Sequence, residues 1–136
     1  MVTVEFDSMG EAVRLALVAG EYVGGGLAVL LLDATGPRSD GYMAEWGVLT
    51  ANVPAAAEWC RGRGNIAIDA DVPAALLEAL EAAGTVRMAG RSAASGMARY
   101  PLATVAGHAL DGMGGLSDVS ANLKLTTFAN ASRRMR

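Results

Sequence analysis

The sequence has 136 residues, which is long enough for one domain to bury a hydrophobic core without disulfides or metal ions. Apolar residues make up 52% and charged residues 18%, a balance that argues against intrinsic disorder because burial can offset the entropy lost on folding. The formal net charge is −3, with a mildly acidic body and a basic end, so the body lacks the clustered Lys and Arg of a nucleic-acid-binding surface. Direct nucleic-acid binding is therefore not expected.

The cysteine content and the N-terminal residues predict a cytoplasmic protein. Cys60 is the only cysteine and can form no intramolecular disulfide, which favours a reducing compartment. The start, MVTVEFDSMG, lacks the basic and apolar stretches of a secretory signal, and no apolar run reaches the roughly 18 residues of a membrane span. We therefore expect no membrane association.

Patterns of apolar residues predict strands in the first half of the chain. Residues 2–6 and 13–17 alternate with period two on either side of the turn-forming DSMG, which favours a hairpin. The continuous apolar run at 27–34 predicts a central strand covered on both faces. A loop at 35–41 follows, and then a strand at 46–54 that ends at a proline, which has no N–H to continue a ladder.

The third quarter of the chain carries the only strong helix signal. A short strand is predicted at 65–69, and a helix follows within the stretch 69–84. Asp71 is placed to cap this helix, and Gly84 is placed just past its end. Leucines at helical spacing form one apolar face, which we expect to pack on the sheet.

A strand, a turn and a last strand are predicted after the helix. Residues 85–88 are predicted to form the first strand. The stretch 91–100 is interpreted mainly as a turn that precedes the last strand. That last strand, at 99–105, contains Pro101 and is therefore expected at the edge of the sheet.

Together these elements predict an α+β protein. We expect a small, largely antiparallel sheet of about five or six strands with one main helix packed on it. The domain spans residues 1–106 in this interpretation. Residues 107–136 are rich in Gly, Ser, Asn and Thr, with few large apolar side chains, and are predicted to form a loosely structured, flexible C-terminal extension.

The residues that could carry catalysis or bind metal are too few and too scattered to form a recognisable motif. His108 is the only histidine, and nothing in the sequence places it beside Cys60. Ser95 does not stand in a Gly-x-Ser-x-Gly motif. Asp69 and Asp71 are too few ligands for a metal site and are better explained as turn and cap residues. We therefore expect no catalytic residues, no cofactor and no metal.

Two groups of residues are compared with the patterns of anion-binding loops. Residues 24–26 are three consecutive glycines, but a predicted strand follows them instead of a helix, so a hairpin turn explains them better than a phosphate loop. Arg91 and Arg99, with Ser92 and Ser95 between them, suit an oxyanion if the turn folds back on itself. The alternative interpretation is a turn whose polar side chains are merely solvated.

Several short motifs resemble an uncharacterised family of small domain-of-unknown-function proteins carried on phages, plasmids and conjugative elements. The resemblance covers about residues 24–105 of this chain. The matching residues are Leu49, Thr50, Asn52, Val53 and Pro54, then Ile68 and Asp69, then Gly90, Arg91, Ser95, Gly96, Tyr100, Pro101 and Leu102. The chain departs from the family pattern at Met97, where an aromatic residue is expected, and at Ala89, where a threonine is expected.

The resemblance implies a biological context and no chemistry. Accessory proteins of mobile elements bind and block host machinery, and some are anti-defence inhibitors of the anti-CRISPR type. We therefore expect a non-enzymatic protein that occludes a host protein complex, with the acidic body as the contact surface. Two alternatives stay open, namely a small-ligand or anion-binding domain that uses the Arg91–Arg99 turn, and a homo-oligomer that assembles through the edge strand at 99–105.

Overall fold

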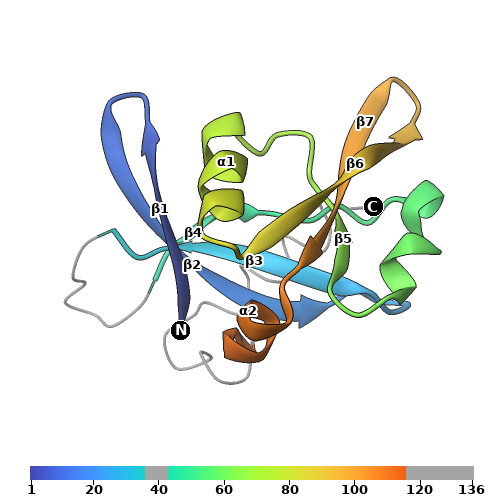
Figure 1. The fold of residues 1–136 in the computed structure, drawn as a ribbon, viewed down its shortest axis with the longest axis horizontal. Coiled ribbons are helices and arrows are strands. Elements are labelled where there is room, and N and C mark those ends of the chain that lie inside the picture. Colours follow the sequence, from blue (N-terminus) through green and yellow to red (C-terminus); the bar gives the residue numbers. More distant parts are fainter. Residues whose placement is uncertain (36–42, 116–136) are drawn as a thin grey trace.

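The computed structural model describes residues 1–35 and 43–115, and it confirms a largely antiparallel α+β protein with one main helix (Figure 1). The predicted loop at 35–41 and the predicted extension beyond residue 115 lie mostly or entirely outside the described residues. The elements are β1 (Val2–Ser8), β2 (Glu11–Glu21), β3 (Leu27–Asp33), β4 (Glu45–Val48), the 3-10 turns η1 (Pro54–Ala56) and η2 (Trp59–Arg61), β5 (Asn65–Ala67), α1 (Ala74–Ala82), β6 (Val86–Ser95), β7 (Ala98–Val105), α2 (Gly107–Gly112) and β8 (Gly114–Gly115).

The strands form two sheets instead of the single sheet predicted. The first has the order β1-β2-β3-β4, with β8 parallel to the end of β2, and the second has the order β5-β7-β6. The segment after β4 joins them, because the amide of Leu49 donates to the carbonyl of Val29 and the amide of Ala51 donates to the carbonyl of Ala67. The strand predicted at 46–54 is therefore short, since the chain changes its pairing partner within it.

The predicted N-terminal hairpin is confirmed. β1 and β2 are antiparallel, with Val4 opposite Leu15, and the turn between them consists of Met9 and Gly10. Both turn residues have positive φ, of 53° and 88°, which is the backbone of the type I′ turn that favours glycine. The side chain of Asp7 accepts a hydrogen bond from the amide of Gly10 at 2.8 Å, which holds the turn closed.

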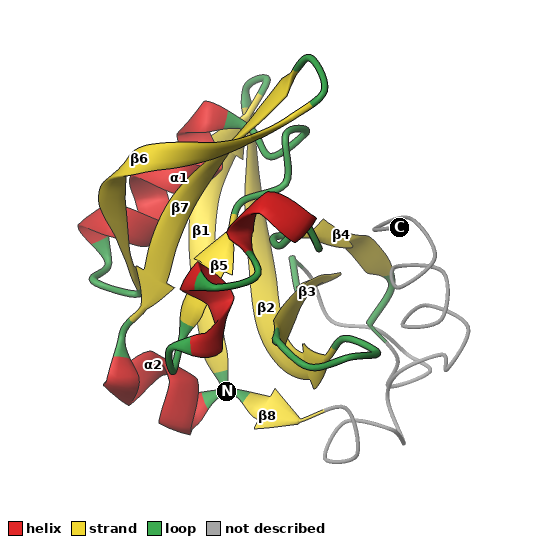
Figure 2. Cartoon of the chain, turned by 90° about the vertical axis from the view of Figure 1, so that its right-hand side faces the viewer, coloured by secondary structure: helices red, strands yellow, loops and turns green. Residues whose placement is uncertain are grey.

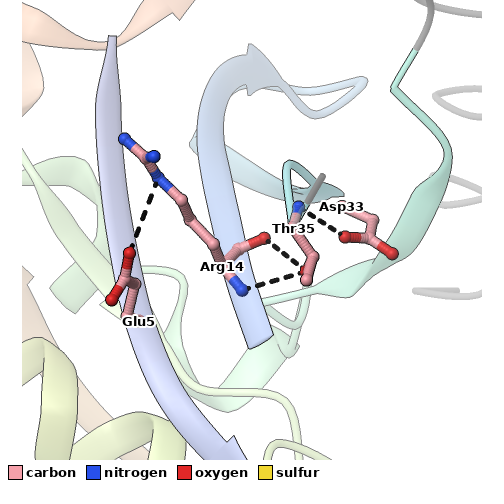
Figure 3. Close-up of polar contacts among 4 residues, drawn as sticks. All are labelled: Glu5, Arg14, Asp33 and Thr35. Atoms are coloured by element: carbon pink, nitrogen blue, oxygen red, sulfur yellow. Dashed lines mark hydrogen bonds and ion pairs between the residues drawn. The ribbon is translucent and has the colours of Figure 1, made fainter. Parts of the chain in front are cut away.

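Polar contacts tie the end of β3 to β2 (Figure 3). The amide of Arg14 donates to the hydroxyl oxygen of Thr35 at 3.0 Å, and that hydroxyl donates to the carbonyl of Arg14 at 3.3 Å. Asp33 accepts the amide of Thr35 at 2.9 Å, and Arg14 reaches Glu5 across the hairpin at 4.0 Å. The chain is thereby fixed over β2 immediately before the undescribed residues 36–42.

Helix α1 lies between the free edges of the two sheets. It contacts both β1 and β6, and Figure 1 shows it between the β1–β2 and β6–β7 hairpins. Leu76 and Leu80 are fully buried in the main core, beside residues of β1, β2, β3, β5, β6 and β7. Phe6 packs edge-on against Trp46 in the same region, with ring centroids 5.6 Å apart. The helix thus supplies the apolar side chains that fill the space between the sheets.

The helix begins later than predicted, and the prediction that Asp71 caps it is wrong. Pro73 is the N-cap residue, with extended backbone and no side-chain cap. A proline disfavours helical backbone in the residue before it, so the helix starts only after Pro73. Asp69 accepts the amide of Asp71 at 2.9 Å, which makes this acidic pair a turn. The predicted end is confirmed, because Gly84 follows the last turn with φ of 72°.

The predicted central strand is confirmed. β3 pairs with β2 on one side and β4 on the other, and residues 28–32 are buried on both faces of the sheet. Residues 107–115, expected to be loosely held, instead form α2 and β8. Ala109 and Met113 of this segment are buried in the main core, so packed structure extends beyond residue 106.

Candidate functional site

The residues predicted to contact an anion or a partner lie on a projecting hairpin formed by β6 and β7 (Figures 1 and 2). The two strands pair from Val86 opposite Val105 to Ser95 opposite Ala98. Only residues 96 and 97 form the turn, so the interpretation of 91–100 as mainly a turn is wrong. The small side chains of this stretch show little apolar periodicity. The sequence pattern therefore did not predict the two paired strands.

Strand alternation divides the four predicted site residues between the two faces of the hairpin. Ala93 is buried in a cluster with Trp59, and Arg91 and Ser95 share its face because they lie two residues away on either side. Ser92 lies on the opposite face. Arg99 shares that opposite face, because it pairs with Ala94. The two guanidinium groups therefore do not face a common anion in this conformation.

Trp59, which sequence reasoning did not single out, supports the middle of the hairpin. The guanidinium carbon of Arg91 lies 4.9 Å from the centroid of the Trp59 ring. The indole N–H donates to the carbonyl of Ile66 at 3.1 Å and to that of Ala103 at 3.3 Å. Because these carbonyls belong to β5 and β7, Trp59 ties η2 to the outer face of the second sheet. The sequence offered one signal for this structural role, a tryptophan next to the only cysteine.

Charge is segregated between the two hairpins. The β6–β7 hairpin carries three exposed arginines, Arg87, Arg91 and Arg99, and contains no acidic residue. The β1–β2 hairpin carries Glu5, Asp7, Glu11 and Glu21 against a single arginine. None of the three β6–β7 arginines takes part in the ion pairs found among the described residues, which join Arg14 to Glu5 and Arg63 to Asp111. The β6–β7 hairpin is therefore a local basic surface on an acidic protein.

The unpaired sheet edge next to this surface is β6, and the prediction that the last strand lies at an edge is wrong. β7 lies between β5 and β6. Pro101 is tolerated there because the side of its backbone that lacks an N–H faces β5, which ends at Ala67. The carbonyl of Pro101 points to the same side and accepts the amide of Ile68 at 2.8 Å. Residues 101–105 of β7 therefore have partners on both sides, and within the described residues β6 has a partner on one side only.

The residues considered for catalysis do not come together. His108 is exposed on α2, and among the described contacts none joins it to Cys60 on η2. Burial raises the pKa of the Cys60 thiol above its ordinary value of 9.0, which lowers the fraction of reactive thiolate. Across residues 1–35 and 43–115 there is no cluster of three or more His, Cys, Asp or Glu that could hold a metal ion.

Comparison with known proteins adds no relative. No protein-family model, no curated protein and no solved structure matches the chain. The resemblance to the mobile-element family therefore stays a prediction. In the part of the chain that the structure describes, neither helix has the length and apolar character needed to cross a membrane.

Proposed function

We propose that this protein acts by binding another protein through the β6–β7 hairpin, without catalysing a reaction of its own. The observation that carries the proposal is the combination of three exposed arginines, a fully exposed methionine and an unpaired edge on one projecting element. Arginine and methionine are enriched in protein interfaces, and a free strand edge can pair with a partner strand.

The arrangement of side chains favours an acidic partner with a cleft. Met97 at the hairpin tip is completely exposed, which suits an apolar anchor. Arg91 and Arg99 lie on opposite faces behind it, so a hairpin inserted into a cleft would present a positive charge to each wall. Complementary charge would also accelerate the encounter. This basic hairpin is a better candidate contact than the acidic body considered from the sequence.

The resemblance to accessory proteins of mobile elements supports a more specific proposal. In it, the partner is a host protein complex, the effect of binding is inhibition, and an anti-defence role of the anti-CRISPR type is one form of that inhibition. A cytoplasmic location, inferred from the single cysteine, is part of the same proposal.

A matched pair of variants tests the proposed contact. The tagged 136-residue chain is used to capture partners from an extract of the cells in which it is naturally expressed, and captured proteins are quantified by mass spectrometry. The double variant Met97→Ser with Arg99→Ser should lose a partner that the wild-type chain retains. The control, Met9→Ser with Arg14→Ser, makes the same changes in the β1–β2 hairpin, where Met9 is equally exposed.

Two outcomes would contradict the proposal. The first is equal capture of every partner by both double variants and the wild-type chain. The second is turnover of a nucleotide, ester or peptide by the purified protein, since that would assign an enzymatic activity.

A further inference from the structure

A cavity of about 310 Å³ lies between the β2–β3 turn and residues 51–61. Its rim is formed by the three glycines at 24–26, and its walls include Tyr22, Asn52, Cys60 and Arg61. In Figure 1 the β2–β3 turn and the short helical segment after β4 lie together at one end of the molecule. The volume is within the range of small-molecule sites, roughly 300 to 1,000 Å³.

The part of the wall formed by Tyr22 is buried, hydrogen-bonded and uncharged. Tyr22 is 6% exposed, and its hydroxyl lies 2.6 Å from the hydroxyl of Thr50, which also accepts the amide of Val29 at 3.2 Å. Burial raises the pKa of Tyr22 far above its ordinary value, with a smaller contribution from the charge of Asp69, so the phenol keeps its proton. The ring therefore offers an uncharged aromatic surface to the cavity.

The rim is held in a conformation that requires glycine. The amide of Tyr22 donates to the carbonyl of Gly26 at 3.0 Å, and the amide of Gly25 donates to the carbonyl of Tyr22 at 2.9 Å. Residues 24–26 have φ between 95° and 98°, which L-residues with side chains rarely adopt. The hairpin turn predicted for these glycines is thus confirmed, and its backbone borders the cavity without side chains in front of it.

The charge that lines the cavity is positive. Among the described residues that line the cavity, Arg61 carries the only charged side chain, and no ion pair joins it to another described residue. The neighbouring Arg63, in contrast, is paired with Asp111. Asp69 does not line the cavity, and Glu21 lines only an adjoining hollow that shares Arg61. The amide of Asn52 adds an uncharged hydrogen-bonding group.

We propose that this cavity binds a small organic anion. The apolar body of the ligand would pack against Tyr22 and the neighbouring aliphatic residues, and its carboxylate or phosphate would be bound by Arg61. This site goes beyond the proposed protein contact and uses different residues, so either proposal can fail without the other.

The only cysteine of the chain makes a direct test possible, because Cys60 lines the cavity. The rate at which Cys60 reacts with the uncharged reagent 4,4′-dithiodipyridine is measured against increasing benzoate or phenyl phosphate. Benzyl alcohol serves as the uncharged control. We expect saturable slowing by at least one of the two anions and none by benzyl alcohol at the same concentrations. Slowing by benzoate alone assigns a carboxylate, and slowing by phenyl phosphate alone assigns a phosphate.

Variants then assign the anion contact. Arg61→Gln should raise the half-saturating concentration about tenfold to a hundredfold, the loss of one hydrogen bond to a charged group. Arg14→Gln, which removes an equal charge from the β1–β2 hairpin and lies in neither proposed site, should leave it unchanged. Amide chemical shifts of residues 24–26 provide a second readout that does not depend on thiol chemistry. The proposal is overturned if neither anion slows the reaction, if benzyl alcohol is equally effective, or if Arg61→Gln binds like the wild type.

Discussion

Arg91 lies over the ring of Trp59, with 4.9 Å between the guanidinium carbon and the ring centroid, and this contact joins the β6–β7 hairpin to η2. Arg99, on the other face of the same hairpin, has no such neighbour in the described contacts. The two arginines that the sequence grouped together therefore have different roles. Arg91 contributes to the stability of the hairpin and also presents its charge at the surface, whereas Arg99 makes no such contact and is available to a partner.

The contact between Arg91 and Trp59 predicts a difference in stability between two arginine variants. Arg91→Ala should lower the free energy of unfolding by about 0.5 to 1 kcal/mol, the usual contribution of an exposed cation–π contact. Arg99→Ala should change it by less than about 0.5 kcal/mol, as is usual for surface positions. Urea denaturation followed by tryptophan fluorescence measures both. Equal effects would show that the ring contact does not stabilise the hairpin.

The position of α1 between the sheets predicts a large loss of stability when its buried face is truncated. Leu80 is 0% exposed, so Leu80→Ala should cost about 2 to 5 kcal/mol through lost burial and the cavity that remains. Glu78→Ala, on the exposed face of the same helix, should be nearly neutral. Thermal or chemical unfolding distinguishes them. A cost below about 1 kcal/mol for Leu80→Ala would mean that the helix does not fill the core.

Two glycines form a matched pair for testing backbone constraints. Gly64 has φ of 78°, and a Cβ there would lie 2.7 Å from the carbonyl oxygen of Val105. Gly64→Ala should therefore cost at least about 2 kcal/mol from the backbone conformation and the clash together. At Gly47 a Cβ meets nothing within 4 Å, so Gly47→Ala should be neutral or slightly stabilising. Similar melting temperatures for the two variants would contradict the described approach of β7 to Gly64.

The buried phenol of Tyr22 predicts a loss of stability at alkaline pH. Its pKa is raised on folding, so its contribution is fully present below the ordinary value of 10.0 and is lost as the pH rises toward the folded-state value. Tyr22→Phe should cost about 1 kcal/mol at neutral pH, through the lost hydrogen bond to Thr50. Above pH 10 the difference from the wild type should shrink, because phenylalanine does not ionise. A constant difference across the alkaline range, measured by urea denaturation at each pH, would contradict the burial of this hydroxyl.

Much of the first sheet could be predicted because each of its segments carries a single sequence pattern that specifies one kind of structure. Alternation at 2–6 and the turn-forming DSMG specify a hairpin, and the apolar run at 27–34 specifies a strand buried on both faces. The start of the helix could not be read correctly from Asp71, because a proline two residues later overrides the capping preference.

The second sheet and the candidate contact were harder to predict because they depend on tertiary pairing. The stretch 89–95 consists mainly of small residues that lack an apolar alternation, and only its pairing with β7 makes it a strand. A proline is usual at an edge, yet Pro101 lies in a middle strand because its missing N–H faces the side on which β5 has already ended. Trp59 and Arg61 contribute to the two proposed sites through contacts between segments that are distant in the sequence.

Site-specific photo-crosslinking in living cells tests the central claim, that the β6–β7 hairpin binds a protein partner, most directly. A photoreactive phenylalanine analogue is placed at Met97 or, as the matched control, at Met9, both of which are fully exposed hairpin-tip residues. We predict a discrete crosslinked protein from position 97 that is absent from position 9. No crosslink from position 97, or the same crosslinked protein from both positions, would contradict the claim.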